Sequence, residues 1–201
     1  MYLIGLTGGI AAGKSTVAAR WVEHGAIEID ADQLAREAVA AGTDGLAQVV
    51  AQFGESILAS DGTLDRAALG AIVFADPEKR LQLEAIIHPR VKLLARQRIS
   101  ALPEASIVVY NVPLLVEAAV DLDFDKVVTV EAPANKQIDR LIKIRGLSRE
   151  EAEHRVSAQA SAAQRANAAD VILNSNQDLS LLLKDADNLW RSIVAKAAEQ
   201  D

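Results

Sequence analysis

The sequence predicts an α/β fold in which a parallel sheet is flanked by helices. Three observations support this prediction. Short apolar runs alternate with helix-forming stretches, an alternation typical of parallel sheets covered on both faces. A glycine-rich loop at Gly8–Ser15 joins the first apolar run to the first helical stretch. The segment from Asp32 to Leu102 has helical periodicity and almost no strand pattern, which indicates a helical insertion between strands.

The elements begin with a strand, a loop and a helix. Tyr2–Thr7 is an apolar run that predicts a buried strand, and Lys14–Glu23 carries helix formers. His24 and Gly25 predict the end of that helix. Ala26–Asp30 follows as a second short strand.

The helical insertion contains two prolines that predict helix starts. Asp76 precedes Pro77, a capping side chain before a proline at the first helical position. Pro89 follows His88 and predicts the start of another helix. We expect His88 to be buried and hydrogen-bonded at that junction, the alternative being a ligand contact.

Strand patterns return at Ser106–Val112, Asp125–Glu131 and Val171–Leu173. A helix is predicted over 133–145, ending before Gly146, and Asp178 is expected to cap a long final helix. The segment after Gly146 begins with a capping box at 148–151 and is charged all round, which predicts an exposed helix and favours a mobile flap.

Composition narrows the function classes. The chain has 201 residues, 50% hydrophobic and 3% aromatic, with a net charge of -7 and no cysteine. An acidic, aromatic-poor surface argues against nucleic-acid binding. The absence of cysteine excludes disulfides and thiolate chemistry. With no signal-peptide pattern and no apolar stretch long enough for a bilayer, we expect a cytoplasmic protein without membrane contact, a monomer or a small homo-oligomer.

The glycine loop fits the pattern G-x-x-x-x-G-K-[ST] and predicts a nucleoside triphosphate site. Its glycines let backbone amides point at phosphate oxygens, and the following helix N-terminus favours anions. Lys14 can reach the β- and γ-phosphates, and Ser15 can offer its hydroxyl to Mg²⁺. The predicted binding residues are Gly8, Gly9, Ile10, Ala11, Ala12, Gly13, Lys14, Ser15 and Thr16.

Two carboxylates follow the second strand, Asp30 and Asp32. Ligands of parallel sheets bind beyond the carboxyl ends of the strands, so both are expected near the reacting centre. One could orient an attacking hydroxyl or accept its proton, and either could hold Mg²⁺ through water. The alternatives are that Asp32 caps a helix beginning near Gln33 and that Asp30 is structural.

The remaining motifs help to distinguish the classes of protein that bind nucleoside triphosphates. The chain has no D-x-x-G motif, and its N-K-x-x-D sequence at 135–139 has the aspartate one residue late for guanine recognition. The sequence therefore favours a small-molecule kinase over a GTPase-type switch. A nucleotide-gated binding protein is the alternative from a different functional class.

Several short motifs are spread over nearly the whole chain. They are Gly8–Thr16, Ile29–Asp32 with Ala35-Arg36, Phe53-Gly54, Asp61–Leu64, Ile87–Pro89, Pro113–Glu117, Ser148…Glu151-Ala152…Arg155…Gln159 and Ala169–Ile172…Asn174. In their order and spacing they resemble the dephospho-CoA kinase family. The resemblance implies transfer of the γ-phosphate of ATP to the ribose 3′-hydroxyl of dephospho-CoA. A related nucleoside, nucleotide or small-molecule kinase of the same fold is the alternative.

The resemblance also implies a division of the chain. A five-stranded parallel P-loop core would cover about 1–32, 103–133 and 163–201, a helical acceptor lobe about 33–102, and a lid about 134–162. Asp32 would be the base or aligner, Lys14 would neutralise phosphates, and Arg140 would bring positive charge as the lid closes. Ser15 and Asp30 would hold Mg²⁺. Arg145 and Arg165 are weaker candidates for the same triphosphate. For all three arginines the alternative is a solvated helix face or a surface ion pair.

The chain departs from the family pattern at three places. Ala11-Ala12 stand where the family commonly has Gly-Ser, and Ala11 cannot relax a left-handed backbone as glycine would. The third strand ends with Asn111 and has no Walker B aspartate. The turn at 145–147 is shorter than in many relatives. Leu114-Leu115 are expected to pack under the acceptor site, and His24 and His154 are expected at the surface without partners.

Overall fold

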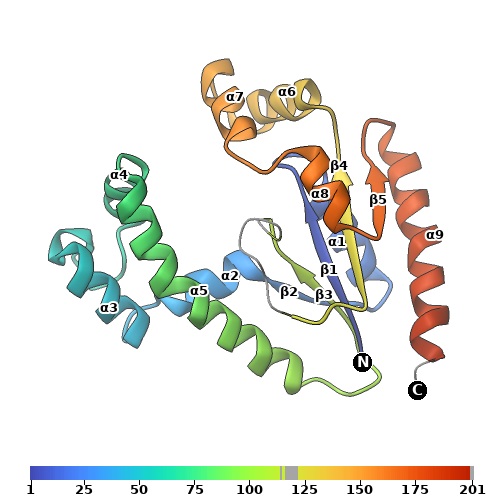
Figure 1. Ribbon diagram of the computed structural model, residues 1–201, viewed down its shortest axis with the longest axis horizontal. Coiled ribbons are helices and arrows are strands. Elements are labelled where there is room, and N and C mark those ends of the chain that lie inside the picture. Colours follow the sequence, from blue (N-terminus) through green and yellow to red (C-terminus); the bar gives the residue numbers. More distant parts are fainter. Residues whose placement is uncertain (114, 116–121, 200–201) are drawn as a thin grey trace. The chain divides into compact units, whose positions relative to one another are not determined.

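A five-stranded parallel sheet in the order β2-β3-β1-β4-β5 forms the centre of the fold (Figure 1). The computed structural model describes residues 1–113, 115 and 122–199. The strands are β1 (Tyr2–Gly8), β2 (Ile27–Asp30), β3 (Ile107–Asn111), β4 (Lys126–Glu131) and β5 (Val171–Asn174). The predicted α/β class with a parallel sheet is therefore confirmed, and each predicted strand is present within a residue or two of its expected bounds.

Helices follow or separate these strands. They are α1 (Lys14–Glu23), α2 (Ala31–Ala38), α3 (Asp44–Phe53), the short 3₁₀ helix η1 (Glu55–Ile57), α4 (Arg66–Phe74), α5 (Pro77–Ser100), α6 (Ala134–Arg145), α7 (Arg149–Ser157), α8 (Ala162–Ala168) and α9 (Leu179–Ala198). Among the described residues, none of these helices combines the length and the apolar character needed to span a bilayer.

Several predicted helix ends have the expected geometry. Asp76 Oδ1 accepts from the backbone N–H groups of the first turn of α5, at 2.9 and 3.3 Å. The Ser148–Glu151 capping box is complete at the start of α7, and Gly146 ends α6 with a left-handed backbone. Asp178 precedes α9, as predicted, but its side chain makes no capping hydrogen bond.

The prediction of a helix start at Pro89 is wrong, because α5 continues through it. Proline removes one helical hydrogen bond and crowds the preceding turn, at a cost of about 3 kcal/mol. Packing of α5 along α2, α3 and α4 outweighs this cost, and Arg90 Nη1 donates to Ile86 O beside the proline at 2.6 Å. His88 lies in the middle of this helix and is exposed, so the prediction that it is buried at a helix junction is also wrong.

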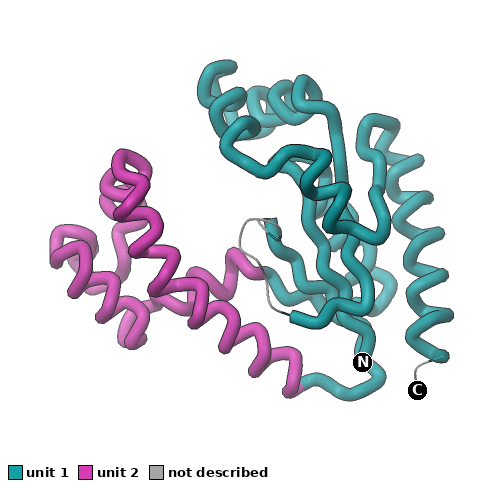
Figure 2. The backbone as a smooth tube through the Cα atoms, viewed as in Figure 1, with its two compact units in different colours: residues 1–30, 102–201 teal, residues 31–101 magenta. Residues whose placement is uncertain are grey.

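The chain divides into two compact units, residues 1–30 with 102–201 and residues 31–101 (Figure 2). The second unit is helical and has its own apolar core, formed by Val39, Val49, Ile57, Leu69 and Val73. The predicted roles of a helical acceptor lobe and of a lid over 134–162 remain predictions.

The core of the first unit lies between one face of the sheet and the helices α1 and α9. Trp21 of α1 and Trp190 of α9 are both buried, with ring centroids 6.2 Å apart. The indole Nε1 of Trp21 donates to the carbonyl oxygen of Ala186 at 3.0 Å. This packing fixes α1, and therefore the loop that precedes it, against the sheet.

A polar cluster joins the C-terminal end of α1 to the middle of α9. Arg20 donates from Nε and Nη2 to the two oxygens of Asp187 at 2.7 and 2.9 Å. His24 Nε2 lies 2.8 Å from Asp187 Oδ1, and the His24 ring stacks on Trp190. His24 thus has partners that sequence reasoning missed. Hydrogen bonds from Arg20 and then from His24 hold the pKa of Asp187 well below its usual range.

Replacing Asp187 by asparagine is expected to lower the melting temperature at neutral pH and to flatten its dependence on pH. Because folding lowers the pKa of this carboxyl, its stabilising contribution is present above the usual value of about 4 and is lost as the pH falls below it. Thermal unfolding between pH 3 and 7 tests this. A variant whose loss of stability is as large at pH 3 as at pH 7 would contradict it.

Candidate active site

The glycine loop connects β1 to α1 at the carboxyl edge of the sheet. Gly13 has φ 107°, a left-handed conformation that favours glycine, and α1 begins at the next residue. The first turn of α1 has no acidic residue, and no side chain in the described part of the chain caps its N-terminus. The amides and the positive end of this helix are thus presented to an anion, as a phosphate site requires.

Ala11 has a left-handed backbone conformation, with φ 56°. This is the position where alanine stands in place of the glycine that is common in the family. A residue with a Cβ pays about 1–2 kcal/mol for this conformation. The turn is closed by a hydrogen bond from Ala12 N to Gly9 O at 3.0 Å. Ala12 itself is fully buried and has no positive φ. The loop therefore holds backbone strain at Ala11 alone among its non-glycine residues.

Ala11→Gly is expected to stabilise the protein, and Ala12→Gly to destabilise it. Glycine relieves the strain at Ala11 but also increases the entropy of the unfolded chain, which leaves a net gain of about 0.5–1 kcal/mol. That corresponds to a rise in melting temperature of roughly 1–4 °C. At Ala12 no strain is relieved, and glycine loses a buried methyl group in addition to the entropic loss. Changes of the same sign in the two variants, measured by thermal unfolding, would refute the assignment of strain.

Gly9 is in close contact with Gln137 of α6. A Cβ at Gly9 would lie 2.0 Å from Gln137 Nε2 and 3.0 Å from Arg165 Nη2, so a larger residue here would require the Gln137 side chain to move. Gln137 is 3% exposed, and its Nε2 has no hydrogen-bond partner among the described residues. A buried donor without an acceptor, beside a loop of backbone amides, fits an anionic ligand rich in oxygen.

Lys14 lies beside Asn111, a residue to which sequence reasoning gave no role. Lys14 Nζ donates to Asn111 Oδ1, and Asn111 Nδ2 donates to Glu28 Oε1 at 2.6 Å. Asn111 is buried at the end of β3, next to β1. It occupies the strand-end position that an acidic Walker B residue would take. A neutral amide holds Lys14 without cancelling its charge. The only signal in the sequence was the position of Asn111 at a strand end.

Arg140 reaches the glycine loop from α6. Its Nη1 donates to the carbonyl oxygens of Ala11 and Ala12 at 3.0 and 3.3 Å. Nη1 and Nη2 also donate to Ser175 Oγ and to Ser175 O, both at 2.8 Å. Among the described residues, the hydrogen-bond acceptors of this guanidinium are neutral oxygens. Its positive charge therefore adds to that of Lys14 at the loop.

Arg165 has a different environment. Its Nε and Nη2 donate to the two carboxylate oxygens of Glu131, both at 2.7 Å, and the two side chains are 5% and 13% exposed. Thr129 Oγ1 also donates to Glu131 Oε1 at 2.6 Å. The alternative of an exposed ion pair is wrong for Arg165, because its pair with Glu131 at the end of β4 is buried. A triphosphate role for Arg165 remains a prediction. Arg145, in contrast, is exposed in the last turn of α6.

The remaining predicted residues lie at the same sheet edge or directly after it. Ser15 is exposed in the first turn of α1, with Thr16 next to it half-buried. Asp30 ends β2 in register with Asn111, and burial and then the charge of Asp30 raise the pKa of Tyr110. Asp32 is exposed in the first turn of α2, the first helix of the second unit.

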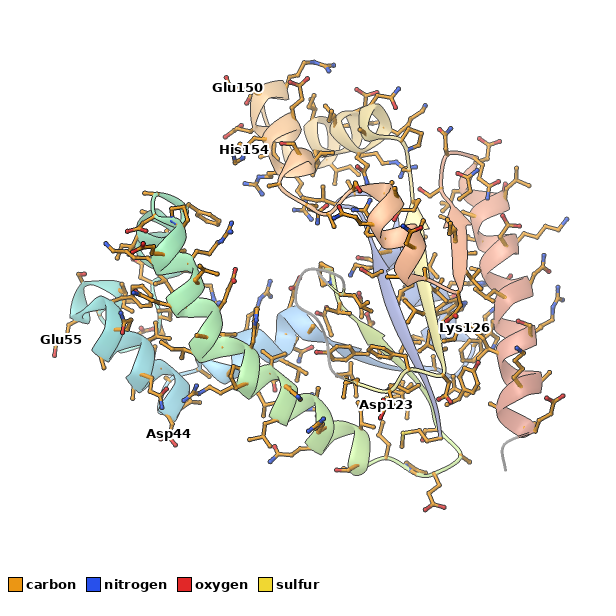
Figure 3. The ribbon with its side chains drawn as sticks, viewed as in Figure 1. Asp44, Glu55, Asp123, Lys126, Glu150 and His154 are labelled. Carbon is orange, nitrogen blue, oxygen red and sulfur yellow. The ribbon has the colours of Figure 1, made fainter. Side chains whose placement is uncertain are left out.

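The alternative that Asp32 caps a helix beginning near Gln33 is wrong, because α2 begins at Ala31. Of the Leu114-Leu115 pair, Leu114 lies outside the described residues. A Cβ added at Gly5 of β1 would lie 3.0 Å from Leu115 Cδ1, which places Leu115 against the sheet. Glu150 and His154, labelled in Figure 3, are exposed on α7, as the charge pattern predicted.

The fold and the loop define the class of protein: an α/β protein with the P-loop NTPase fold. Solved structures agree with the fold. The Campylobacter jejuni dephospho-CoA kinase has a TM-score of 0.67 at 22% identity, covering 95% of this chain and 96% of its own. TT1252 from Thermus thermophilus has a TM-score of 0.82 at 34% identity over 97% of both chains.

Sequence comparison identifies the family within that class. The model of the dephospho-CoA kinase family matches residues 2–181. A dephospho-CoA kinase of Streptomyces avermitilis is 45% identical over 98% of this chain and 96% of its own. The chain belongs to the dephospho-CoA kinase family and is a kinase.

Proposed function

We propose that this protein transfers the γ-phosphate of ATP to the ribose 3′-hydroxyl of dephospho-CoA, giving CoA and ADP. Family membership over residues 2–181 supports the acceptor. The glycine loop supports ATP as the phosphoryl donor, because Lys14 and Arg140 place positive charge there beside the uncapped N-terminus of α1. Phosphoryl transfer depends mainly on positioning and charge neutralisation, which this arrangement can provide.

Asp32 is the proposed base or aligner for the acceptor. The hydroxyl oxygen forms a bond to the γ-phosphorus while the bond between that phosphorus and the β–γ bridging oxygen breaks, which releases ADP. The hydroxyl proton passes to a carboxylate oxygen of Asp32. Two features support the assignment. Asp32 follows the carboxyl end of β2 by two residues, and its side chain is exposed in the first turn of α2.

Ser15 and Asp30 are the proposed residues for Mg²⁺. When bound with ATP, the ion would neutralise phosphate charge and orient the transferring group. No group of three or more acidic, histidine or cysteine residues in the described part of the chain is arranged to hold a metal. That fits an ion held by a Ser15 hydroxyl, phosphate oxygens and water, with Asp30 acting through water.

The second unit is proposed to bind dephospho-CoA, and the segment of about 134–162, which includes α6 and α7, is proposed to form the lid. The separate apolar core of residues 31–101 supports a lobe that folds as a unit of its own. The lid role is supported by α7, which is exposed and charged, as expected of a surface segment that covers the triphosphate. A cytoplasmic location and a monomeric or small homo-oligomeric state complete the proposal.

The test is ADP release from ATP and Mg²⁺ with dephospho-CoA, compared with adenosine, AMP, shikimate and gluconate as acceptors. Stimulation by dephospho-CoA alone, with a product of the mass of CoA, is the expected result. Stimulation by another acceptor would retain the kinase class and overturn the acceptor. No stimulation by any acceptor, together with slow hydrolysis, would favour a nucleotide-gated binding protein.

A further inference from the structure

Gln159 makes a contact with the glycine loop that the proposed function does not use. It lies between α7 and α8, and its Oε1 accepts a hydrogen bond from the backbone N–H of Ile10 at 2.7 Å. Loop amides of this kind are the groups that a phosphate-binding loop offers to its ligand. A side chain from the proposed lid therefore lies within hydrogen-bond distance of the place where phosphate oxygens are expected.

The position of Gln159 is set by the sheet. The carbonyl oxygen of Ala160, the next residue, accepts from Arg165 Nη1. Arg165 is itself held by both oxygens of Glu131 at the end of β4, and this pair is almost fully buried. The chain on the C-terminal side of Gln159 is thus anchored to a central strand by a charge-assisted pair, the strong kind of hydrogen bond. An anchored backbone restricts the positions that the side chain can occupy.

The Gln159 amide has a second functional end. Because Oε1 and Nε2 share one carbon, fixing Oε1 on Ile10 also fixes the direction of the two Nε2 donors. Within the described residues no hydrogen bond from Gln159 Nε2 to the protein is present. The amide thus offers neutral donors beside the loop without neutralising the charge of Lys14 or Arg140.

We propose that Gln159 contacts the substrate: Oε1 holds the Ile10 amide, and Nε2 donates to an oxygen of the terminal phosphate of a bound nucleoside triphosphate. The inference rests on the proposed function of the loop. The amides at the start of α1, on the helix side of the loop, serve the inner phosphates. Ile10 lies on the strand side, which leaves its surroundings to the terminal phosphate. Gln159 would then distinguish a triphosphate from a diphosphate.

The experiment is calorimetric binding of ADP and of a non-transferable ATP analogue, each with Mg²⁺, to the full chain and its variants. Gln159→Ala removes both the oxygen and the nitrogen of the amide. It should lower the affinity for the analogue roughly tenfold or more, the effect of losing one hydrogen bond to a charged group. ADP affinity should change little. Gln159→Glu has the same shape and keeps an acceptor for Ile10, but replaces the donors with a negative charge. It should weaken the analogue further.

Gln48→Ala, at an exposed position of α3, is the matched glutamine control and should leave both affinities unchanged. Melting temperatures identify any variant that does not fold, and the isosteric Gln159→Glu then carries the test. Equal weakening of ADP and analogue in the Gln159 variants would overturn the phosphate contact and leave only support of the loop. Wild-type affinity for the analogue in Gln159→Glu would also overturn it. Failure of the unmodified protein to bind either nucleotide would instead overturn the proposed function.

Discussion

Lys14→Ala is expected to reduce kcat/KM for ATP by about 10²–10³-fold, the size of effect seen when one preorganised charge or donor is removed from developing negative charge. The ammonium group interacts with phosphate oxygens in both the ground and the transition state, so KM for ATP should rise while kcat falls. Steady-state kinetics with dephospho-CoA at saturation measure both quantities. Near-normal kcat/KM would contradict the assigned role.

Two further variants make the Lys14 result specific. Lys184→Ala removes an exposed lysine from α9 in the same unit and should leave kcat/KM unchanged. Lys14→Arg keeps the charge, but the planar guanidinium replaces a compact ammonium that Asn111 holds. We expect partial activity from Lys14→Arg. Activity equal to that of Lys14→Ala would show that the contact with Asn111 and the shape of the group matter more than charge.

Asp32→Asn is expected to lower kcat by about 10²–10⁴-fold, the usual contribution of a positioned acid or base. Asparagine keeps the shape and removes the proton acceptor, so the affinity for ATP, measured by calorimetry without acceptor, should be retained. The combination of intact binding and slow turnover separates loss of the base from loss of the fold. Turnover at the wild-type rate would exclude Asp32 from the chemistry.

Asp44 provides a matched control for this substitution. It is an exposed aspartate in the first turn of α3, labelled in Figure 3, as Asp32 is in the first turn of α2. Asp44→Asn loses the same favourable interaction with a helix N-terminus, about 0.3–1 kcal/mol. It should therefore reproduce any loss of stability in Asp32→Asn without the loss of turnover. A similar fall in kcat for both variants would attribute the effect to helix stability.

The local patterns of the sequence predicted most of the elements. Alternating apolar runs placed β1, β3 and β4, and capping residues such as Asp76 and Ser148 placed the starts of α5 and α7. The glycine loop could be predicted because phosphate binding by backbone amides needs glycines, a lysine and a helix start at fixed spacing. These features depend on neighbours in the chain, and a sequence displays such neighbours directly.

The errors arose where distant contacts compete with local preference. Pro89 reads locally as a helix start, but α2, α3 and α4 pack along α5 and keep it continuous. His24 and Asp187 are far apart in the sequence, so their pairing could not be predicted from either segment. Arg165 on a short polar helix reads as exposed, yet the end of β4 supplies a buried carboxylate for it.

The sequence by itself thus determined the fold class, the glycine loop with Lys14 and Ser15, and the family, because each rests on residue types at short or fixed spacing. Only the tertiary structure decided what surrounds the loop. Asn111 and Glu28 beside Lys14, Arg140 on the loop carbonyls and Gln159 on the Ile10 amide come from separate strands and helices. The order of parallel strands and the packing of helices bring them to one edge of the sheet, and no local pattern encodes which side chains meet there.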